Sequence, residues 1–272
     1  MTLSRLLMRF SNYACLILSL AIHSELFAQV YSVEPIEKGF QYSSDPTQTF
    51  LWESKSAKAI LIFIPGGEGQ IKLKPERKDL GGFYGNTLKP LADPSKTAGL
   101  FDVVVFDSPF TLPSGANYPS SRSTPDHMMR IESVVLFYKN KLNKPIWLMG
   151  HSNGAVSVTE FYKYLQDKNK ENLISGVIYS SARNGASFNS NTNLPVLFLA
   201  HEQDGCSKST PNSSRSVYEK LKKTDSQAVE YVLIKGGEAQ ADEPCRSGHH
   251  MFYGASDEAY KAINDFVAPF YK

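Results

Sequence analysis

The residues with the clearest chemical potential form the pattern Gly-x-Ser-x-Gly, as Gly150-His151-Ser152-Asn153-Gly154, directly after the apolar run 146–149. This order predicts a strand that turns sharply into a helix, with Ser152 at the tip in a strained backbone conformation. Glycine at both ends of the pattern allows close packing, because side chains there would collide with the neighbouring strand and helix. The free N–H groups of the helix start would favour a negative charge that develops beside the serine. The pattern therefore predicts a nucleophilic serine.

A serine hydroxyl is a poor nucleophile at neutral pH, so it needs an imidazole to take its proton and a carboxylate to orient that imidazole. After a turn of this kind the expected chain order is serine, acid, histidine. Asp204 follows the apolar run 195–200, and His249 and His250 follow the predicted strand 229–234. Because the carboxyl ends of parallel strands line one crevice, these side chains can converge there.

Two choices among these residues stay open. The pair Gly248-His249 favours His249 as the base, whereas His-x-Phe-x-Gly favours His250, which we prefer because the chain after the base usually returns to the terminal helix. Asp204 competes with Glu202, but Gly205 suits a turn that would aim Asp204 at the site. We interpret the remaining histidines, His151 and His201, as packing and strand-end residues.

A glycine-rich turn, Pro65-Gly66-Gly67-Glu68-Gly69, follows the buried apolar run 59–64. Such a turn lets backbone N–H groups approach a ligand closely, so it is a candidate for half of an oxyanion hole. Asp107 ends a third apolar run, 101–106, and we interpret it as a loop-capping residue rather than a second acid of the site.

These motifs together resemble those of a secreted serine hydrolase of the α/β-hydrolase superfamily, esterase-like and without a large cap domain. The resemblance covers essentially all of residues 29–272. It implies Ser152 as nucleophile, Asp204 as acid and His250, or else His249, as base. It also implies an oxyanion hole made by the N–H groups of Asn153 and of Gly67 or Glu68. Since many esterases carry a histidine where this chain has Pro65, the choice of loop donor stays open.

The elements that must position these residues alternate along the chain. Apolar runs predict buried strands, and segments with helical spacing follow them, among them one that begins at the cap Thr124 with Pro125 in its first turn. This alternation predicts the α/β class: a single domain with a mainly parallel central sheet and helices on both faces. Residues 29–47 are polar and mixed and are expected to be an entry segment, and residues 48–53 are compatible with an edge strand.

Composition sets limits on the partners. The chain has 272 residues, enough for one large α/β domain, with 42% hydrophobic and 21% charged residues and a net charge of +2. No Lys/Arg cluster dominates any segment, which argues against a nucleic-acid partner. We expect a small-molecule acyl substrate and neither a metal nor an organic cofactor.

The N-terminus predicts export. Arg5 and Arg9 precede the apolar run 13–22, and Ala28 offers a cleavage position, which is the layout of a signal peptide over residues 1–28. The run is short for a membrane span, so we expect no stable membrane insertion after cleavage; a retained anchor helix is the alternative. The mature domain, residues 29–272, would then be periplasmic or secreted.

Cysteine usage agrees with export. Cys15 lies in the expected signal, which leaves the even pair Cys206 and Cys245 for a disulfide in an oxidising compartment. The bond would tie the loop of Asp204 to the loop of the histidine base. Two unpaired thiols are an alternative, and a metal pair is disfavoured because no Cys-x-x-Cys spacing is present.

The expected reaction is cleavage of an ester or related acyl bond through an acyl-enzyme on Ser152. Acyl transfer to an alcohol by the same three residues is one alternative. A non-catalytic binding protein on the same scaffold is another, disfavoured because serine, acid and histidine all occur in the expected order.

Overall fold

The computed structural model describes residues 26–39, 42–112, 120–223, 228–239 and 242–272. Residues 1–25, the larger part of the expected signal peptide, lie outside the described residues. Cleavage after Ala28 therefore stays a prediction, and it would remove the first two residues of the first strand, Phe27–Val33.

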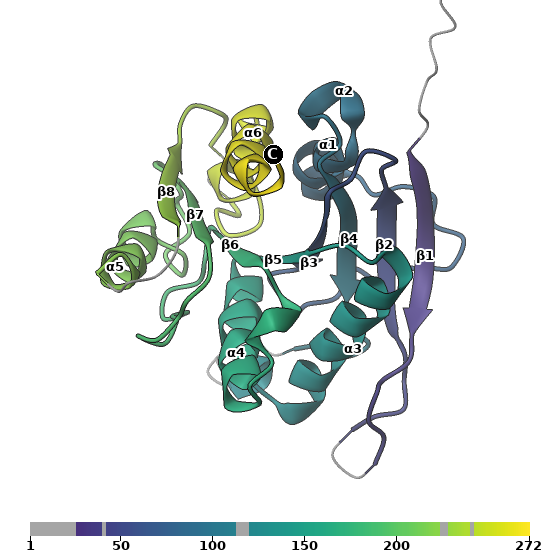
Figure 1. Ribbon diagram of the computed structural model, residues 1–272. Coiled ribbons are helices and arrows are strands. Elements are labelled where there is room, and N and C mark those ends of the chain that lie inside the picture. The colour runs from purple at the N-terminus through teal and green to yellow at the C-terminus, as the bar shows by residue number, and fades with distance from the viewer. Residues whose placement is uncertain (1–25, 40–41, 113–119, 224–227, 240–241) are drawn as a thin grey trace, which may run out of the picture.

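A single eight-stranded sheet forms the centre of the described chain, in the order β1-β2-β4-β3-β5-β6-β7-β8 (Figure 1). β1 pairs antiparallel with β2, and β2 with β4; every other neighbouring pair is parallel. The mainly parallel sheet predicted from the sequence is thus confirmed. The strands are β1 (Phe27–Val33), β2 (Thr47–Glu53), β3 (Ala59–Ile64), β4 (Phe101–Asp107), β5 (Ile146–His151), β6 (Gly176–Ser180), β7 (Val196–His201) and β8 (Val229–Ile234).

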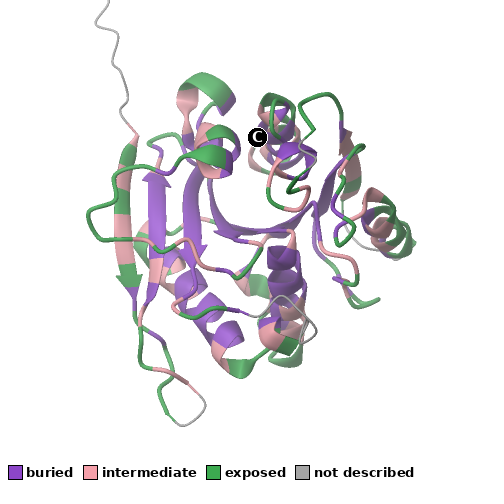
Figure 2. Ribbon diagram, turned by 180° about the vertical axis from the view of Figure 1, so that it is seen from behind, coloured by how far each residue is buried: buried purple, intermediate pink, exposed green. Residues whose placement is uncertain are grey.

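Helices cover both faces of this sheet, and the strands between them are largely buried (Figure 2). Residues of α3, α4 and α5 pack on one face, and residues of η1, α1 and α6 on the other. The helices are the π-helix η1 (Tyr84–Leu88), α1 (Lys89–Ala92), α2 (Pro94–Thr97), α3 (Pro125–Leu142), α4 (Asn153–Asp167), α5 (Pro211–Leu221) and α6 (Ser256–Val267), with the 3₁₀ turns η2 (Ser120–Arg122), η3 (Glu171–Leu173), η4 (Gly248–Met251) and η5 (Ala268–Tyr271).

The inner strands are mostly apolar because both of their faces are covered. In β3, Ile60 and Ile62 contribute to the core beneath α3 and α4, whereas Leu61 and Phe63 contribute to the core beneath α1 and α6. Successive side chains of a strand point to opposite faces, so a strand between two helical layers is apolar at nearly every position. This explains why the continuous apolar runs predicted strands correctly.

The N-terminal part of the fold corrects two sequence-based expectations. Residues 27–33, which span the end of the expected signal peptide and the start of the expected entry segment, form the edge strand β1. The sequence shows no strand pattern there because polar Gln29 and Ser32 interrupt the apolar residues. β2 is not an edge strand: β1 covers its outer side, and Phe50, Leu51 and Trp52 are fully buried. An edge strand is solvated along one side, so its pattern resembles that of a loop.

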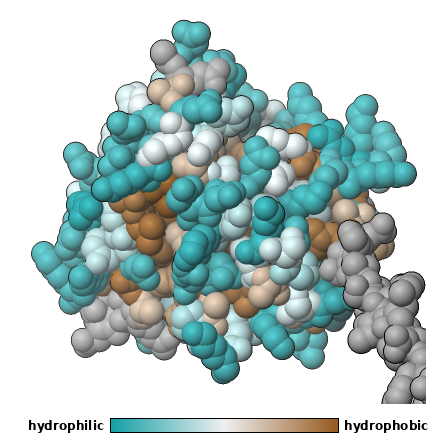
Figure 3. Space-filling model, turned by 90° about the horizontal axis from the view of Figure 1, so that it is seen from above, coloured by the Kyte–Doolittle hydropathy of each residue, from teal (hydrophilic) through white to brown (hydrophobic). Residues whose placement is uncertain are grey.

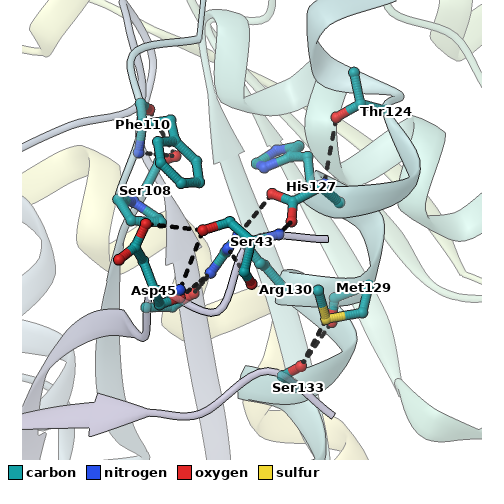
Figure 4. Close-up of polar contacts among 12 residues, drawn as sticks. Ser43, Asp45, Ser108, Phe110, Thr124, His127, Met129, Arg130 and Ser133 are labelled. Atoms are coloured by element: carbon teal, nitrogen blue, oxygen red, sulfur yellow. Dashed lines mark hydrogen bonds and ion pairs between the residues drawn. The ribbon is translucent and has the colours of Figure 1, made fainter. Parts of the chain in front are cut away.

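A buried arginine fastens the segment before β2 to α3 (Figure 4). Arg130, 1% exposed, donates from Nε to Asp126 Oδ2 at 2.7 Å, from one Nη to the carbonyl of Asp45 at 2.5 Å and from the other to the carbonyl of Ser43 at 3.1 Å. Asp126 also accepts the N–H of Ser43 at 3.0 Å. A single ion pair on the first turns of α3 therefore positions a loop more than 80 residues away in the chain.

The surface seen from above is mostly hydrophilic, with smaller groups of hydrophobic residues between (Figure 3), as is usual for globular proteins. Residues 181–195, which link β6 to β7, contain no helix or strand, so no cap domain is inserted there, as predicted. Within the described ranges, no helix combines the length and the apolar character that crossing a membrane requires.

The close packing of α4 against the sheet depends on Gly154. A Cβ at this position would lie 2.0 Å from the carbonyl oxygen of Ile64 in β3. We expect Gly154→Ala to lower the free energy of unfolding in urea by about 1–3 kcal/mol or more, because backbone on both sides must shift. Gly81→Ala is the matched control, since its Cβ would meet nothing within 4 Å, and it should change stability by less than about 0.5 kcal/mol. Equal stability of the two variants would contradict the packing argument.

Candidate active site

Ser152 stands between the end of β5 and the start of α4, in the uncommon conformation φ 55°, ψ −122°. Its N–H donates to Ser180 O at 3.0 Å, and its carbonyl accepts the N–H groups of Ala155 and Arg183, each at 3.1 Å. Backbone strain of this kind costs about 1–3 kcal/mol and persists only where the surroundings hold it. The sharp strand-to-helix turn predicted from the sequence is therefore present.

Glycines surround this serine for steric reasons. A Cβ at Gly150 would lie 2.4 Å from the carbonyl oxygen of Gly154, and a Cβ at Gly66 would lie 2.8 Å from the Cβ of Ser152. Real side chains do not approach so closely. The absence of side chains at 66 and 150 is what lets the glycine-rich loop, the strand and the helix meet at Ser152.

Asp204 and His250 form a buried pair, with His250 Nδ1 2.8 Å from Asp204 Oδ2 and side-chain exposures of 0% and 1%. The other carboxylate oxygen, Oδ1, accepts the N–H of Cys206 at 2.9 Å. A carboxylate only accepts hydrogen bonds, so the proton lies on Nδ1 and the lone pair of a neutral imidazole lies on Nε2. Nε2 is buried and has no hydrogen-bond partner among the described residues. This arrangement leaves a base with its acceptor atom free.

The competing residues occupy other places. His249 Nδ1 lies 3.1 Å from the carbonyl of Gln203, and its ring stacks on that of His201 at 4.3 Å. Glu202 faces Lys235 at 3.9 Å, with its side chain 35% exposed. The geometry thus favours His250 over His249 and Asp204 over Glu202 as a coupled acid and base.

A cavity of about 360 Å³ brings Ser152 and His250 together with the loop residues Gly66, Gly67 and Glu68. Its wall includes residues that the sequence did not single out, and whose approach to the serine no local pattern signals: Phe63, Phe83, Tyr84, Arg246 and Met251. The volume is near the lower end of the range for small-molecule sites. A compact ligand that reaches both Ser152 and His250 fits this space.

Backbone N–H groups without an acceptor among the described residues occur on two segments next to Ser152, the first turn of α4 and the glycine-rich loop. The N–H of Asn153 is the first of α4 and has no acceptor within the helix. On the loop, Gly67 adopts φ +52°, and neither its N–H nor that of Glu68 donates to a described residue. Gly67 and Glu68 line the same cavity as Ser152, and Asn153 follows Ser152 directly in the chain, so all three stay candidates for the oxyanion donors.

Two polar residues near the site have structural roles. Asp107 accepts the N–H groups of Ile71 and Leu73, each at 2.7 Å, so it caps the loop as predicted. His151 packs against Phe83 at 4.7 Å and places Nδ1 3.0 Å from Ser180 Oγ. The pKa of His151 lies well below its usual range, mainly because the ring is buried and to a smaller extent because His250 is nearby. The ring is therefore neutral at pH 7.

Cys206 and Cys245 are joined in a disulfide, as the cysteine count predicted. Cys206 lies two residues after Asp204, and Cys245 lies five residues before His250 and lines the cavity. The bond therefore links the acid loop after β7 to the histidine loop after β8.

Comparison with solved structures shows the α/β-hydrolase fold. Similar structures include a lid-less α/β serine hydrolase from Xanthomonas campestris (14% identity, TM-score 0.56, covering 90% of this chain and 95% of that one) and a dienelactone hydrolase from Anabaena variabilis (13%, 0.54, 89% and 98%). A hyperthermophilic esterase from Pyrobaculum calidifontis is similar at 12% identity and a TM-score of 0.59, covering 89% and 83%. No family model and no curated protein matches the sequence.

Reduction of the disulfide should destabilise the protein. The bond joins residues with a sequence separation of 39. Closing a loop of this length lowers the entropy of the unfolded chain and thereby raises the free energy of unfolding by about 3–4 kcal/mol. We expect strong reductant to lower the melting temperature by about 6–15 °C, measured by circular dichroism with thiol titration to verify reduction. A variant with Cys206→Ser and Cys245→Ser should melt at the lower temperature whether or not reductant is present. An unchanged melting temperature in the fully reduced protein would contradict the prediction.

Stability should fall in mild acid. Burial lowers the pKa of both His127 and His151 well below the usual value near 6.5, and nearby cationic groups add to the effect. Below pH 6.5 both histidines bind a proton in the unfolded chain but stay neutral in the folded chain. The free energy of unfolding is therefore highest above pH 6.5 and decreases as the pH falls below it. From pH 7.5 to 5.5 we expect urea unfolding to show a loss of about 2–3 kcal/mol. In His127→Gln we expect this loss of unfolding free energy to be about half as large. The same decrease with pH in wild type and variant would contradict the prediction.

Proposed function

We propose that this protein is a serine hydrolase that cleaves an ester or related acyl bond through a covalent acyl-enzyme. The observation that carries the proposal is the buried His250–Asp204 pair. Nε2 of His250 has no hydrogen-bond partner among the described residues, and His250 lines the same cavity as Ser152 on its strained turn. The α/β-hydrolase fold supports the same reaction class, because serine hydrolases and esterases share it.

In the proposed reaction, Ser152 Oγ attacks the acyl carbon while His250 Nε2 takes the hydroxyl proton. Asp204 holds the ring through Nδ1 and stabilises the imidazolium that forms. The negative charge on the former carbonyl oxygen is met by the N–H of Asn153 and by those of Gly67 and Glu68. His250 then gives its proton to the leaving alcohol, and the acyl group remains on Ser152.

Water completes the cycle by the same route in reverse. His250 removes a proton from the water molecule, the hydroxide attacks the acyl carbon, and the proton returns to Ser152 Oγ as the acid leaves. The histidine ends each half-reaction neutral, so no metal ion or organic cofactor is needed for the proton balance.

We further propose that the chain is exported to the periplasm or beyond. The disulfide supports this proposal, because such bonds persist in oxidising compartments. The expected signal peptide over residues 1–28 supplies the route.

Labelling with a fluorophosphonate probe tests the reaction class. We expect wild type to be labelled and to hydrolyse p-nitrophenyl acetate, because Ser152 is activated by His250. Ser152→Ala should lose labelling and His250→Gln should lose at least about 10³-fold in kcat, while His249→Gln should keep most of it. A folded wild type that is not labelled would instead support a binding protein on this scaffold.

A further inference from the structure

Behind the glycine-rich loop lies a second buried arginine, Arg122, which the sequence did not single out. It is 1% exposed and lies at the end of η2 (Ser120–Arg122). Its Nη1 donates to the carbonyl of Pro65 at 3.1 Å and to Ser157 Oγ of α4 at 3.0 Å. Its Nη2 donates to the carbonyls of Gly66 and Gly67 at 3.4 and 2.8 Å. One guanidinium thus binds three successive carbonyls and anchors them to α4.

Arg122 contacts the side of the loop opposite to its donors. In a trans peptide the C=O and the N–H point in opposite directions. The carbonyl of Gly66 shares a peptide plane with the N–H of Gly67, and the carbonyl of Gly67 shares one with the N–H of Glu68. Holding these two carbonyls therefore orients both N–H groups away from the guanidinium. Gly66, Gly67 and Glu68 line the cavity and Arg122 does not, which agrees with this orientation.

A second restraint acts on the same peptide. The side chain of Asn153 donates from Nδ2 to the carbonyl of Gly67 at 2.9 Å, and its Oδ1 accepts from Arg183 at 2.9 Å. Asn153, the proposed donor on the helix side, therefore also holds the loop that carries the other proposed donors. Both halves of the oxyanion hole are joined through Gly67.

The charge of Arg122 is not neutralised by an ion pair. No carboxylate of the described residues lies within ion-pair distance of it, so the backbone carbonyls and Ser157 solvate its two Nη groups, while its buried Nε has no hydrogen-bond partner among these residues. The pKa of Arg122 is lowered to about 10, mainly because the side chain is buried and to a smaller extent because Arg183 is nearby. The guanidinium stays protonated at neutral pH. A buried charge of this kind is costly to keep, which indicates a role beyond filling space.

We propose that Arg122 is a positioning residue for catalysis: its planar fork holds the peptides of Gly66 and Gly67 so that the N–H groups of Gly67 and Glu68 bind the oxyanion. The proposal rests on the proposed hydrolase function and extends it to a residue that does not touch the substrate. The N–H donors bind the substrate oxygen strongly only when negative charge develops on it in the transition state. Less well oriented donors therefore raise the activation free energy and leave the affinity for the ester nearly unchanged.

The test uses Arg122→Lys, which keeps the charge but loses the fork, and Asn153→Ala, which keeps the backbone donor but loses the second restraint. With p-nitrophenyl acetate we expect kcat to fall about tenfold to a hundredfold in Arg122→Lys and about threefold to tenfold in Asn153→Ala, with KM within about twofold. The Ki of 1,1,1-trifluorobutan-2-one, whose adduct with serine carries an oxyanion, should rise in proportion. Should Arg122→Lys fail to fold, Asn153→Ala still decides the matter.

Arg130→Lys is the matched control, because Arg130 is equally buried and also holds loop carbonyls, but those of Ser43 and Asp45 instead of those of the glycine-rich loop (Figure 4). We expect it to lose stability while kcat changes less than twofold. Unchanged kcat and Ki in Arg122→Lys and Asn153→Ala, or an equal loss in Arg130→Lys, would overturn the positioning role. If wild type itself does not cleave the ester, or Ser152→Ala does so equally well, the proposed function fails instead.

Discussion

The whole site depends on one constraint: the backbone at Ser152 is held in a conformation that it would not adopt alone. Its φ of 55° and ψ of −122° persist because β5, β6 and α4 all contribute hydrogen bonds or packing around it. Glycines at 66, 150 and 154 make this convergence possible, since a Cβ at any of them would overlap neighbouring atoms. Strain at the serine is thus stabilised by the packing of the sheet and its helices.

Three separate interactions hold the other loops of the site near this serine. The disulfide joins the loops of Asp204 and His250, which come from neighbouring strands β7 and β8. Asp107 caps the chain that follows the glycine-rich loop, and Arg122 holds that loop from behind. A carboxylate, a disulfide and a guanidinium therefore each orient a loop that has no regular structure of its own, which is how loops acquire the precision that a reaction requires.

Much of the fold followed from the sequence because buried parallel strands are apolar at nearly every position. The strand β1 did not, since a half-exposed edge strand carries polar residues on its solvent side and Gln29 and Ser32 conceal its pattern. The residues of the cavity wall could not be predicted from the sequence for another reason. Phe83 and Tyr84 lie in a stretch rich in glycine and proline, and only the packing of η1 against the core directs them towards Ser152.

The sequence by itself determined the chemical types and their order: a serine between glycines, then an acid, then a histidine, with two cysteines beside the last two. It left His249 and His250 undecided, because neighbouring residues differ only in the direction of their side chains, and that direction depends on the turn they occupy. The tertiary structure favours His250, because its Nδ1 lies 2.8 Å from Asp204 Oδ2, whereas His249 Nδ1 lies 3.1 Å from a backbone carbonyl. It alone also placed Arg122 behind the loop, since contacts across 55 or more residues leave no periodic trace in the chain.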